Sequence, residues 1–185
     1  MTILELTKIL YYASIVVWLL PPFRQYKGRF FYFFLILALM DPLFLLNNLI
    51  FKINFPIQIS VCLVLCLLFS TIKKEDLKKY KSLVLAVTVI IVVLVFFGFN
   101  QIQNFTLTVI IQCWIFFIVL KLFITRFAQD GKINWFLLVF IFYELTLIIK
   151  FLNVLVGFAD AIGFYIITSI AQIIFGLFFS FHREN

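Results

Sequence analysis

The sequence has few charged residues, and most of them are basic. Charged residues make up 12% of the 185 residues, with 15 Lys and Arg against 8 Asp and Glu, while hydrophobic residues make up 65%. Soluble domains use about 25% charged and about 45–50% apolar residues. Such a chain does not supply the polar surface of a soluble domain, and its composition predicts an all-α membrane protein.

Histidine, cysteine and catalytic motifs are also scarce. The one histidine, His182, stands near the end of the chain, whereas a histidine-ligated zinc site needs two or three. Cys62 and Cys66 are four residues apart and are more simply small residues at a helix contact; with Cys113 they form no disulfide framework. No G-x-S-x-G, H-E-x-x-H or Gly-rich phosphate loop occurs. We therefore expect no metal, no cofactor and no enzymatic activity.

Long apolar runs are what the sequence has instead. A run of about 17–25 apolar residues lets an α-helix cross about 30 Å of hydrocarbon. The sequence predicts seven transmembrane helices in a single polytopic domain, residues 1–185, at about 3–21, 30–51, 53–70, 82–100, 105–124, 133–155 and 159–181. The first run holds Glu5 and Lys8 in its first two turns and ends in Pro21 and Pro22, not in the small residues of a signal-peptide cleavage site.

The basic residues alternate between the connections and so predict an orientation. One set of connections carries Arg24, Lys27, Arg29, Lys73, Lys74, Lys78, Lys79, Lys81, Lys121, Arg126, Lys132 and Arg183. Lys8, Lys52 and Lys150 lie toward the other side. Because cytoplasmic loops retain Lys and Arg, the N-terminus is predicted outside and the C-terminus in the cytoplasm. The net charge of +7 is then explained without nucleic-acid binding. An anionic-lipid contact at "KKEDLKKYK" is an alternative that Glu75 and Asp76 weaken.

A displacement of 103 residues aligns two apolar segments. "GRFFYFFLILALMDPLFLLNN" begins at Gly28 and "GKINWFLLVFIFYELTLIIKF" at Gly131, and the alignment pairs Asp41 with Glu144. Shared hydrophobic composition is the alternative explanation. A true repeat would give parallel triplets joined by an inverting fourth span, a 3+1+3 plan like that of SWEET transporters. The likeness is one of plan only, since "LPPFRQYKGR" lacks the Pro-Gln pair of the proline-glutamine loop family.

Asp41 stands in the middle of the second predicted span. A carboxylate near the bilayer centre costs about 2.5–3.5 kcal/mol on insertion scales, so we expect Asp41 to face the interior of the bundle. Pro42 has no N–H for the carbonyl of Ala38 and predicts a helix kink with a free acceptor. Asn48 lies on the face of Asp41, whereas Asn47 points about 100° away. These groups are candidates for binding a polar solute or a proton.

Further polar groups stand in the last three spans. Glu144 is the second buried acid, and Lys150 lies about 120° around the helix from it, so we expect Lys150 to extend toward the outer interface and neither acid to have a basic partner. Ala161, Tyr165, Ser169, Gln172 and Gly176 follow one stripe of the last span. Tyr165, Ser169 and Gln172 are candidate binding residues, although such stripes, like Gln112, also serve as helix contacts.

Two functions remain open from the sequence. The first is transport of a small polar solute between two three-helix units, with Asp41 and Glu144 holding the solute or a proton. The second is a non-enzymatic sensor or accessory subunit that acts through a partner membrane protein or a homo-oligomer. The richness in Phe, Ile, Lys and Asn is typical of a bacterial cytoplasmic (inner) membrane protein, whose main partner is the lipid bilayer.

Overall fold

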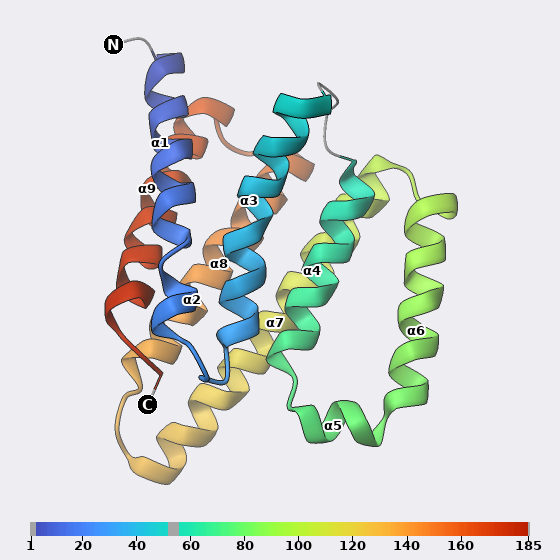
Figure 1. Ribbon diagram of the computed structural model, residues 1–185, viewed down its shortest axis with the longest axis vertical. Helices are drawn as coiled ribbons and strands as arrows, with labels where there is room; N and C mark the ends of the chain where they lie inside the picture. Colours follow the sequence, from blue (N-terminus) through green and yellow to red (C-terminus); the bar gives the residue numbers. More distant parts are fainter. Residues whose placement is uncertain (1–2, 52–55, 185) are drawn as a thin grey trace.

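The computed structural model describes residues 3–51 and 56–184, and all regular secondary structure in these ranges is helical (Figure 1). The elements in chain order are α1 (Ile3–Trp18), α2 (Pro21–Arg24), α3 (Phe31–Phe51), α4 (Ile57–Thr71), α5 (Lys74–Lys79), α6 (Lys81–Val93), the π-helical turn η1 (Leu94–Gly98), α7 (Gln101–Asp130), α8 (Trp135–Val156) and α9 (Ala161–Phe181). The fold-class prediction of an all-helical chain is confirmed for the described residues.

Five described stretches are long and apolar enough to cross a membrane. They are Glu5–Arg24, Lys81–Gly98, Gln101–Asp130, Trp135–Val156 and Ala161–Phe181. Two shorter apolar stretches, Phe31–Asn47 and Ile57–Thr71, lie in α3 and α4. These helices make the chain compatible with an integral membrane protein. Each overlaps one of the seven apolar segments expected from the sequence, with ends that differ by up to four residues, except that α7 extends beyond its segment by four residues at its start and six at its end.

Six of the described helices form a closed ring. α1 packs against α3, α3 against α4, α4 against α7, α7 against α8, α8 against α9, and α9 returns to α1. In Figure 1, α1, α4, α7 and α9 run downward, while α3 and α8 run upward between them. The short α2 packs on α3 and α9. The triplets α1–α3–α4 and α7–α8–α9 therefore have the same succession of directions.

α6 stands outside this ring. Its principal neighbours are α5 and η1, and η1 in turn touches α4 (Figure 1). Only 6% of the apolar stretch Lys81–Gly98 is buried, and its buried residue is Val95 of η1. A helix that is apolar on all sides and buries almost none of its surface in the protein is suited to a lipid environment.

Side-chain caps mark the starts of the last three helices. Asn100 and Gln103 form a reciprocal capping box at the start of α7. Asn134 accepts a hydrogen bond from Leu137 N at the start of α8, and Asp160 accepts one from Gly163 N at the start of α9. These oxygens satisfy amide groups that the first turn of a helix leaves without partners. The capping residues thus fix where α7, α8 and α9 begin.

Aromatic side chains fill one half of the ring interior. Phe33, Phe34, Phe140 and Phe179 have no exposed surface, and Trp18 is 5% exposed. The rings of Phe33 and Phe140 lie 4.7 Å apart and those of Phe34 and Phe179 lie 4.9 Å apart. Aromatic pairs contribute about 0.5–1.5 kcal/mol beyond the area they bury. Through these rings α3 and α8 contact each other across the ring of helices.

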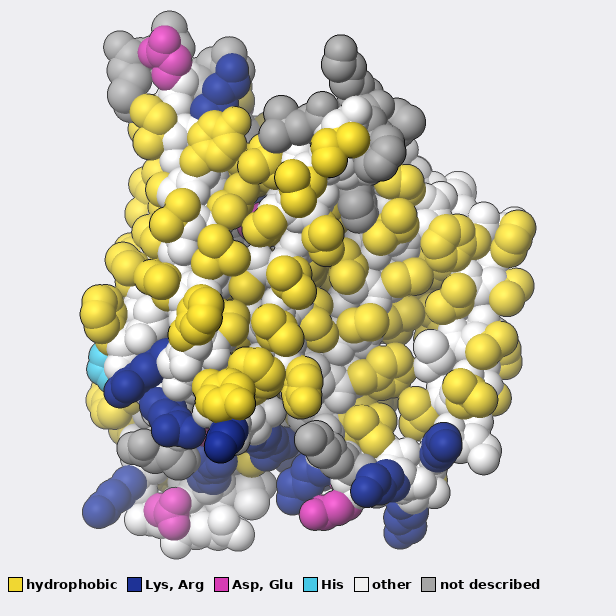
Figure 2. Space-filling model, in the orientation of Figure 1, with side chains coloured by type: hydrophobic (Ala, Val, Ile, Leu, Met, Phe, Trp, Pro, Cys, Tyr) yellow, Lys and Arg dark blue, Asp and Glu magenta, His cyan; other side chains and the backbone are white. Residues whose placement is uncertain are grey.

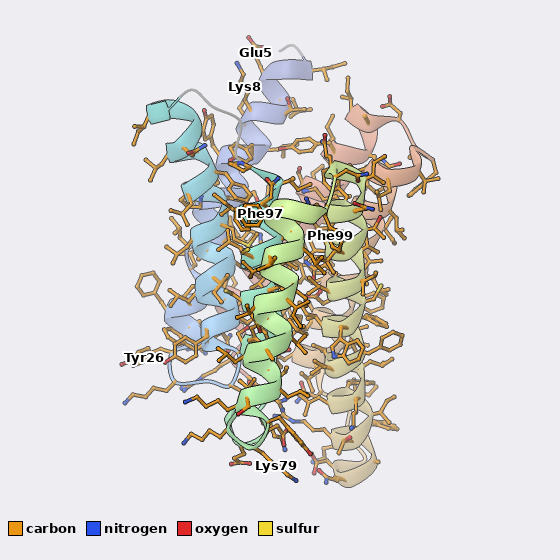
Figure 3. The ribbon with its side chains drawn as sticks, turned by 90° about the vertical axis from the view of Figure 1, so that its right-hand side faces the viewer. Glu5, Lys8, Tyr26, Lys79, Phe97 and Phe99 are labelled. Atoms are coloured by element: carbon orange, nitrogen blue, oxygen red, sulfur yellow. The ribbon has the colours of Figure 1, made fainter. Side chains whose placement is uncertain are left out.

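The two ends of the bundle differ in charge. We call the end that carries α2, α5, the α7–α8 connection and the C-terminal residues the basic end, and the opposite end the far end. Lys and Arg gather at the basic end, below a band of hydrophobic side chains (Figure 2). Figure 3 places Tyr26 and Lys79 at the basic end and Glu5 and Lys8 at the far end. The uneven distribution of charge expected from the sequence is present along the bundle axis.

Gln25 fastens the C-terminal residues to the basic end. It is fully buried, and its Nε2 donates to the carbonyls of Phe179 (3.0 Å) and His182 (2.7 Å). Its Oε1 accepts from Glu184 N at 3.2 Å, and the Glu184 carboxylate pairs with Arg126 at 2.8 Å. One amide therefore satisfies carbonyls that the end of α9 leaves free.

α1 and α9 approach each other most closely beside Gly176. A Cβ at this position would lie 2.7 Å from Val17 Cγ1 and 3.4 Å from the Trp18 ring. Glycine at this point of the predicted small-residue stripe lets the two helix backbones come together, as in other membrane helix pairs.

We predict that Gly176→Ala lowers the thermal stability of the purified protein, because overpacking costs about 1–3 kcal/mol. Val17→Ala in the same chain removes the clashing methyl group and should restore part of the loss. Gly98→Ala is the matched control, since its nearest neighbour, Leu94 Cδ2, is 3.4 Å away. Equal unfolding temperatures for Gly176→Ala and wild type in the same detergent would contradict this packing.

Candidate functional site

Asp41 faces the interior of the ring, as expected from the sequence. It lies in the middle of α3, which continues through Pro42 as a helix to Phe51. The Asp41 carboxylate interacts electrostatically with Tyr11 of α1, Lys150 of α8 and Tyr165 of α9. Tyr11 also donates a long hydrogen bond, 3.4 Å, to the Asp41 carbonyl. Four helices therefore meet around this one acid.

Lys150 is close enough to Asp41 for the two charges to interact, but the described residues show no direct ion pair between these side chains. Its Nζ lies 5.8 Å from the centre of the Tyr165 ring and interacts electrostatically with Asp41. A cation within about 6 Å of an aromatic face is attracted to it. Helical spacing separates Lys150 from Glu144, but it does not reveal that the ring of helices brings Lys150 near the acid of α3.

The stripe on α9 is divided between the interior and the far end. Tyr165 and Ser169 stand one helical turn apart on the same face of α9, and Ser169 is buried. Gln172 is partly buried, a turn closer to the basic end, and Ala161 is exposed. The structure thus brings Tyr165 and Ser169 to the neighbourhood of Asp41. The side chain of Asn48, also expected there, lies outside the described residues.

A cavity of about 440 Å³ opens beside α1 and α9 at the far end. Its lining combines aromatic, apolar and polar groups: Thr7, Lys8, Tyr11, Tyr12, Ala161, Ile162 and Tyr165. Tyr11 and Tyr165 belong both to this lining and to the surroundings of Asp41. The cavity volume is within the range of about 300–1,000 Å³ typical of small-ligand sites. Two tyrosines therefore separate an open cavity from a pair of opposite charges.

Aromatic rings close the interior on the basic side of this pair. Tyr143 is 3% exposed and interacts electrostatically with Asp41, and its ring lies 4.9 Å from Trp18 and 6.0 Å from Phe175. Beyond these rings lie Phe34, Phe140 and Phe179, packed without exposed surface. The ring interior consequently has a polar layer toward the far end and a dry aromatic layer toward the basic end.

Glu144 is buried on a different face of α8. Ring contacts turn Tyr143 toward α1 and α9, whereas Glu144, the next residue, lies about 100° around the helix. Besides α1 and α9, α8 contacts α7 and, through Phe140, Phe33 of α3, and Glu144 is buried among these helices. It has no exposed surface, and neither carboxylate oxygen has a hydrogen-bond partner among the described residues. Neither Asp41 nor Glu144 lines the cavity beside α1 and α9.

α7 adds a second set of buried polar groups. Asn104, Thr108 and Gln112 recur every four residues on one face of α7, and all three are buried. Thr108 donates to the Asn104 carbonyl, whereas the Asn104 amide and Gln112 Oε1 have no partner among the described atoms. Polar side chains in such positions are costly to leave without partners. Gln112 was recognised in the sequence, but Asn104 was not.

No protein-family model, curated protein or solved structure matches this chain.

We predict that Asp41 and Lys150 stabilise the fold as a pair. Lys150→Met removes the cation that interacts with Asp41; the same change costs about 3–5 kcal/mol in direct buried ion pairs, and we expect a smaller loss here because no direct ion pair is formed. The double variant Asp41→Asn/Lys150→Met should therefore lose less stability than the two single changes added together. Thermal or chemical unfolding in detergent measures this difference, with Lys8→Met, at the exposed mouth of the cavity, as the control. Additive losses would show that the two side chains do not act together.

Proposed function

We propose that this protein is a multi-pass transporter of a small polar solute, with Asp41 and Lys150 as its binding groups. The observation that carries the proposal is the Asp41–Lys150 pair, which lies in the ring interior next to the cavity lined by Tyr11 and Tyr165. Ionisable groups inside a membrane are costly and mark solute or proton pathways by default. The absence of catalytic motifs in the sequence agrees with a function other than catalysis.

The proposed topology has seven spans with the far end outside and the basic end in the cytoplasm. Clustering of Lys and Arg at the basic end supports this orientation (Figure 2). The ring of helices supports the 3+1+3 plan. If α1, α3 and α4 correspond to α7, α8 and α9 in that order, then the contact of α1 with α9 corresponds to the contact of α7 with α4, and both contacts are present. Such a relation is expected for parallel repeats about an axis along the membrane normal. α6, outside the ring, is the inverting linker.

In this topology the cavity is the outward entrance and the aromatic layer is the closed inner barrier. Transport requires the layer around Phe34, Phe140 and Phe179 to open while the entrance closes, as α3 and α8 move against each other. Alternating access in repeat transporters is largely rocking of one unit against the other around a fixed site. α3 contacts α8 through aromatic side chains such as Phe33 and Phe140. Contacts between side chains are compatible with such movement of the two helices.

The charges of Asp41 and Lys150 favour a solute that carries both a positive and a negative charge. Asp41 is complementary to an ammonium group and Lys150 to a carboxylate, while Lys8 adds a positive charge at the entrance. We propose a small zwitterion as the solute class. Glu144, buried and without a hydrogen-bond partner among the described residues, is the proposed carrier of a coupled proton.

An accessory or sensor subunit is the second candidate, and α6 is the observation that favours it. The apolar surface of α6 and η1 is almost entirely free of contacts with the ring. This function predicts a partner protein that remains bound during purification in mild detergent. A homogeneous monomer or homo-oligomer that transports solute in liposomes would exclude the need for such a partner.

We predict pH-dependent uptake of zwitterions by liposomes that contain the purified protein. Radiolabelled alanine serves as the zwitterion, with acetate and methylammonium as solutes of single charge. Asp41→Asn should abolish uptake because it removes the group that binds the ammonium. Glu144→Gln should leave exchange of alanine across the membrane but remove its response to a pH gradient. Glu75→Gln, an exposed acid of α5, is the control and should behave as wild type.

Two outcomes would contradict this mechanism. Transport that survives the double variant Asp41→Asn/Glu144→Gln unchanged would show that neither acid takes part. Faster uptake of acetate or methylammonium than of alanine would show that the pair does not select a zwitterion.

A further inference from the structure

Arg29 lines several cavities at the basic end. It lies in the connection between α2 and α3, and its Nη2 donates to the Thr71 carbonyl at the end of α4 (3.4 Å). Its guanidinium also lies 5.4 Å from the centre of the Phe30 ring. These contacts hold the side chain in place, yet the buried Nε has no hydrogen-bond partner among the described atoms. A guanidinium has five N–H donors, and the bond to Thr71 uses one on Nη2, so the terminal nitrogens retain donors for a further ligand.

The cavity between α4 and α7 is basic at one end. It has a volume of about 410 Å³, and its lining includes three cations, Arg29, Lys73 and Lys121, and one acid, Asp76. Burial lowers the pKa of Arg29, an effect that Glu184 opposes and Arg126 increases. A guanidinium nevertheless retains its charge at neutral pH. The cavity therefore offers an excess of positive charge to an anion.

The same cavity has an apolar wall that leads away from the charges. Trp114, Ile118 and Leu122 of α7 line it together with Lys121, and these positions follow one stripe of the helix. Trp114 is 62% exposed. α7 runs toward the basic end, so Trp114 lies about 10 Å nearer the middle of the bilayer than Lys121, at about 1.5 Å per residue. A ligand with an anionic group and a long apolar part matches this order of side chains.

We propose that the cavity between α4 and α7 binds the headgroup of an anionic phospholipid, with its acyl chains along Trp114 and Ile118. Arg29, Lys73 and Lys121 would contact the phosphate. In the proposed topology the basic end faces the cytoplasmic leaflet, which carries anionic lipid. This site differs from a diffuse contact with the loop "KKEDLKKYK", because Arg29 and Lys121 come from segments far from that loop in the sequence. The lipid site rests on the proposed orientation of the protein in the membrane, but it does not require the protein to be a transporter.

Native mass spectrometry of the detergent-purified protein tests the proposal, with phosphatidylglycerol as the anionic lipid and phosphatidylcholine as the zwitterionic one. Wild type should retain phosphatidylglycerol in preference to phosphatidylcholine. The variant Lys73→Gln/Lys121→Gln should lose phosphatidylglycerol affinity by at least about tenfold, since each basic residue near an anionic surface contributes about 1 kcal/mol. Both lysines are exposed, so this variant should fold normally.

The variant Lys78→Gln/Lys79→Gln is the matched control. It removes the same charge from exposed positions of α5 that do not line the cavity. The proposal expects it to bind phosphatidylglycerol within about twofold of wild type, and an equal loss in both variants would show a diffuse attraction and overturn the site. Inorganic phosphate distinguishes a lipid from a free anion. If phosphate displaces phosphatidylglycerol at low concentration and binds as tightly without lipid, the apolar wall has no part in binding and the lipid assignment is wrong.

Discussion

A charged group inside hydrocarbon has to find its partner within the protein, and this constraint organises the described structure. Asp41 of α3 and Lys150 of α8 interact electrostatically across the ring, so the two buried charges partly compensate each other. Tyr11 and Tyr165 complete the surroundings from α1 and α9. On the basic side the same two helices meet through Phe33 and Phe140 instead. One helix pair is thus held by opposite charges in one half and by aromatic rings in the other.

This division links the fold to the proposed function. Helix association in a membrane lacks the hydrophobic driving force that acts in water, and relies on close packing and polar contacts. Close packing is concentrated in the aromatic layer and beside Gly176 of α9. The polar layer lies next to an open cavity. A bundle whose packed and polar regions are separate along its axis can retain its fold while one of the two regions opens.

The sequence predicts much of the fold because apolar length and charge position act locally. The helical segments, their approximate ends and the concentration of basic residues at one end follow from runs that can be counted. The inward direction of Asp41 also follows, from the cost of exposing it to lipid. The partner of Asp41 does not, because Lys150 is separated from it by more than 100 residues and only the closed ring brings them together. Gln25 gives no signal either, since an amide after "PPFR" resembles any polar loop residue until the end of α9 is placed over it. The alignment places Glu144 at the same depth of its span as Asp41, and a common site for the two acids stays a prediction.

In the proposed mechanism the interior is open to the far end down to Tyr165 and is sealed by the aromatic layer on the basic side. Cysteine accessibility tests it most directly, in a chain whose native Cys62, Cys66 and Cys113 are replaced by alanine. A thiol introduced by Tyr165→Cys should react with a membrane-impermeant maleimide added from the outside, and one introduced by Phe140→Cys should react from neither side. Reaction at position 140 from the outside, or at position 165 only from the cytoplasm, would contradict the account.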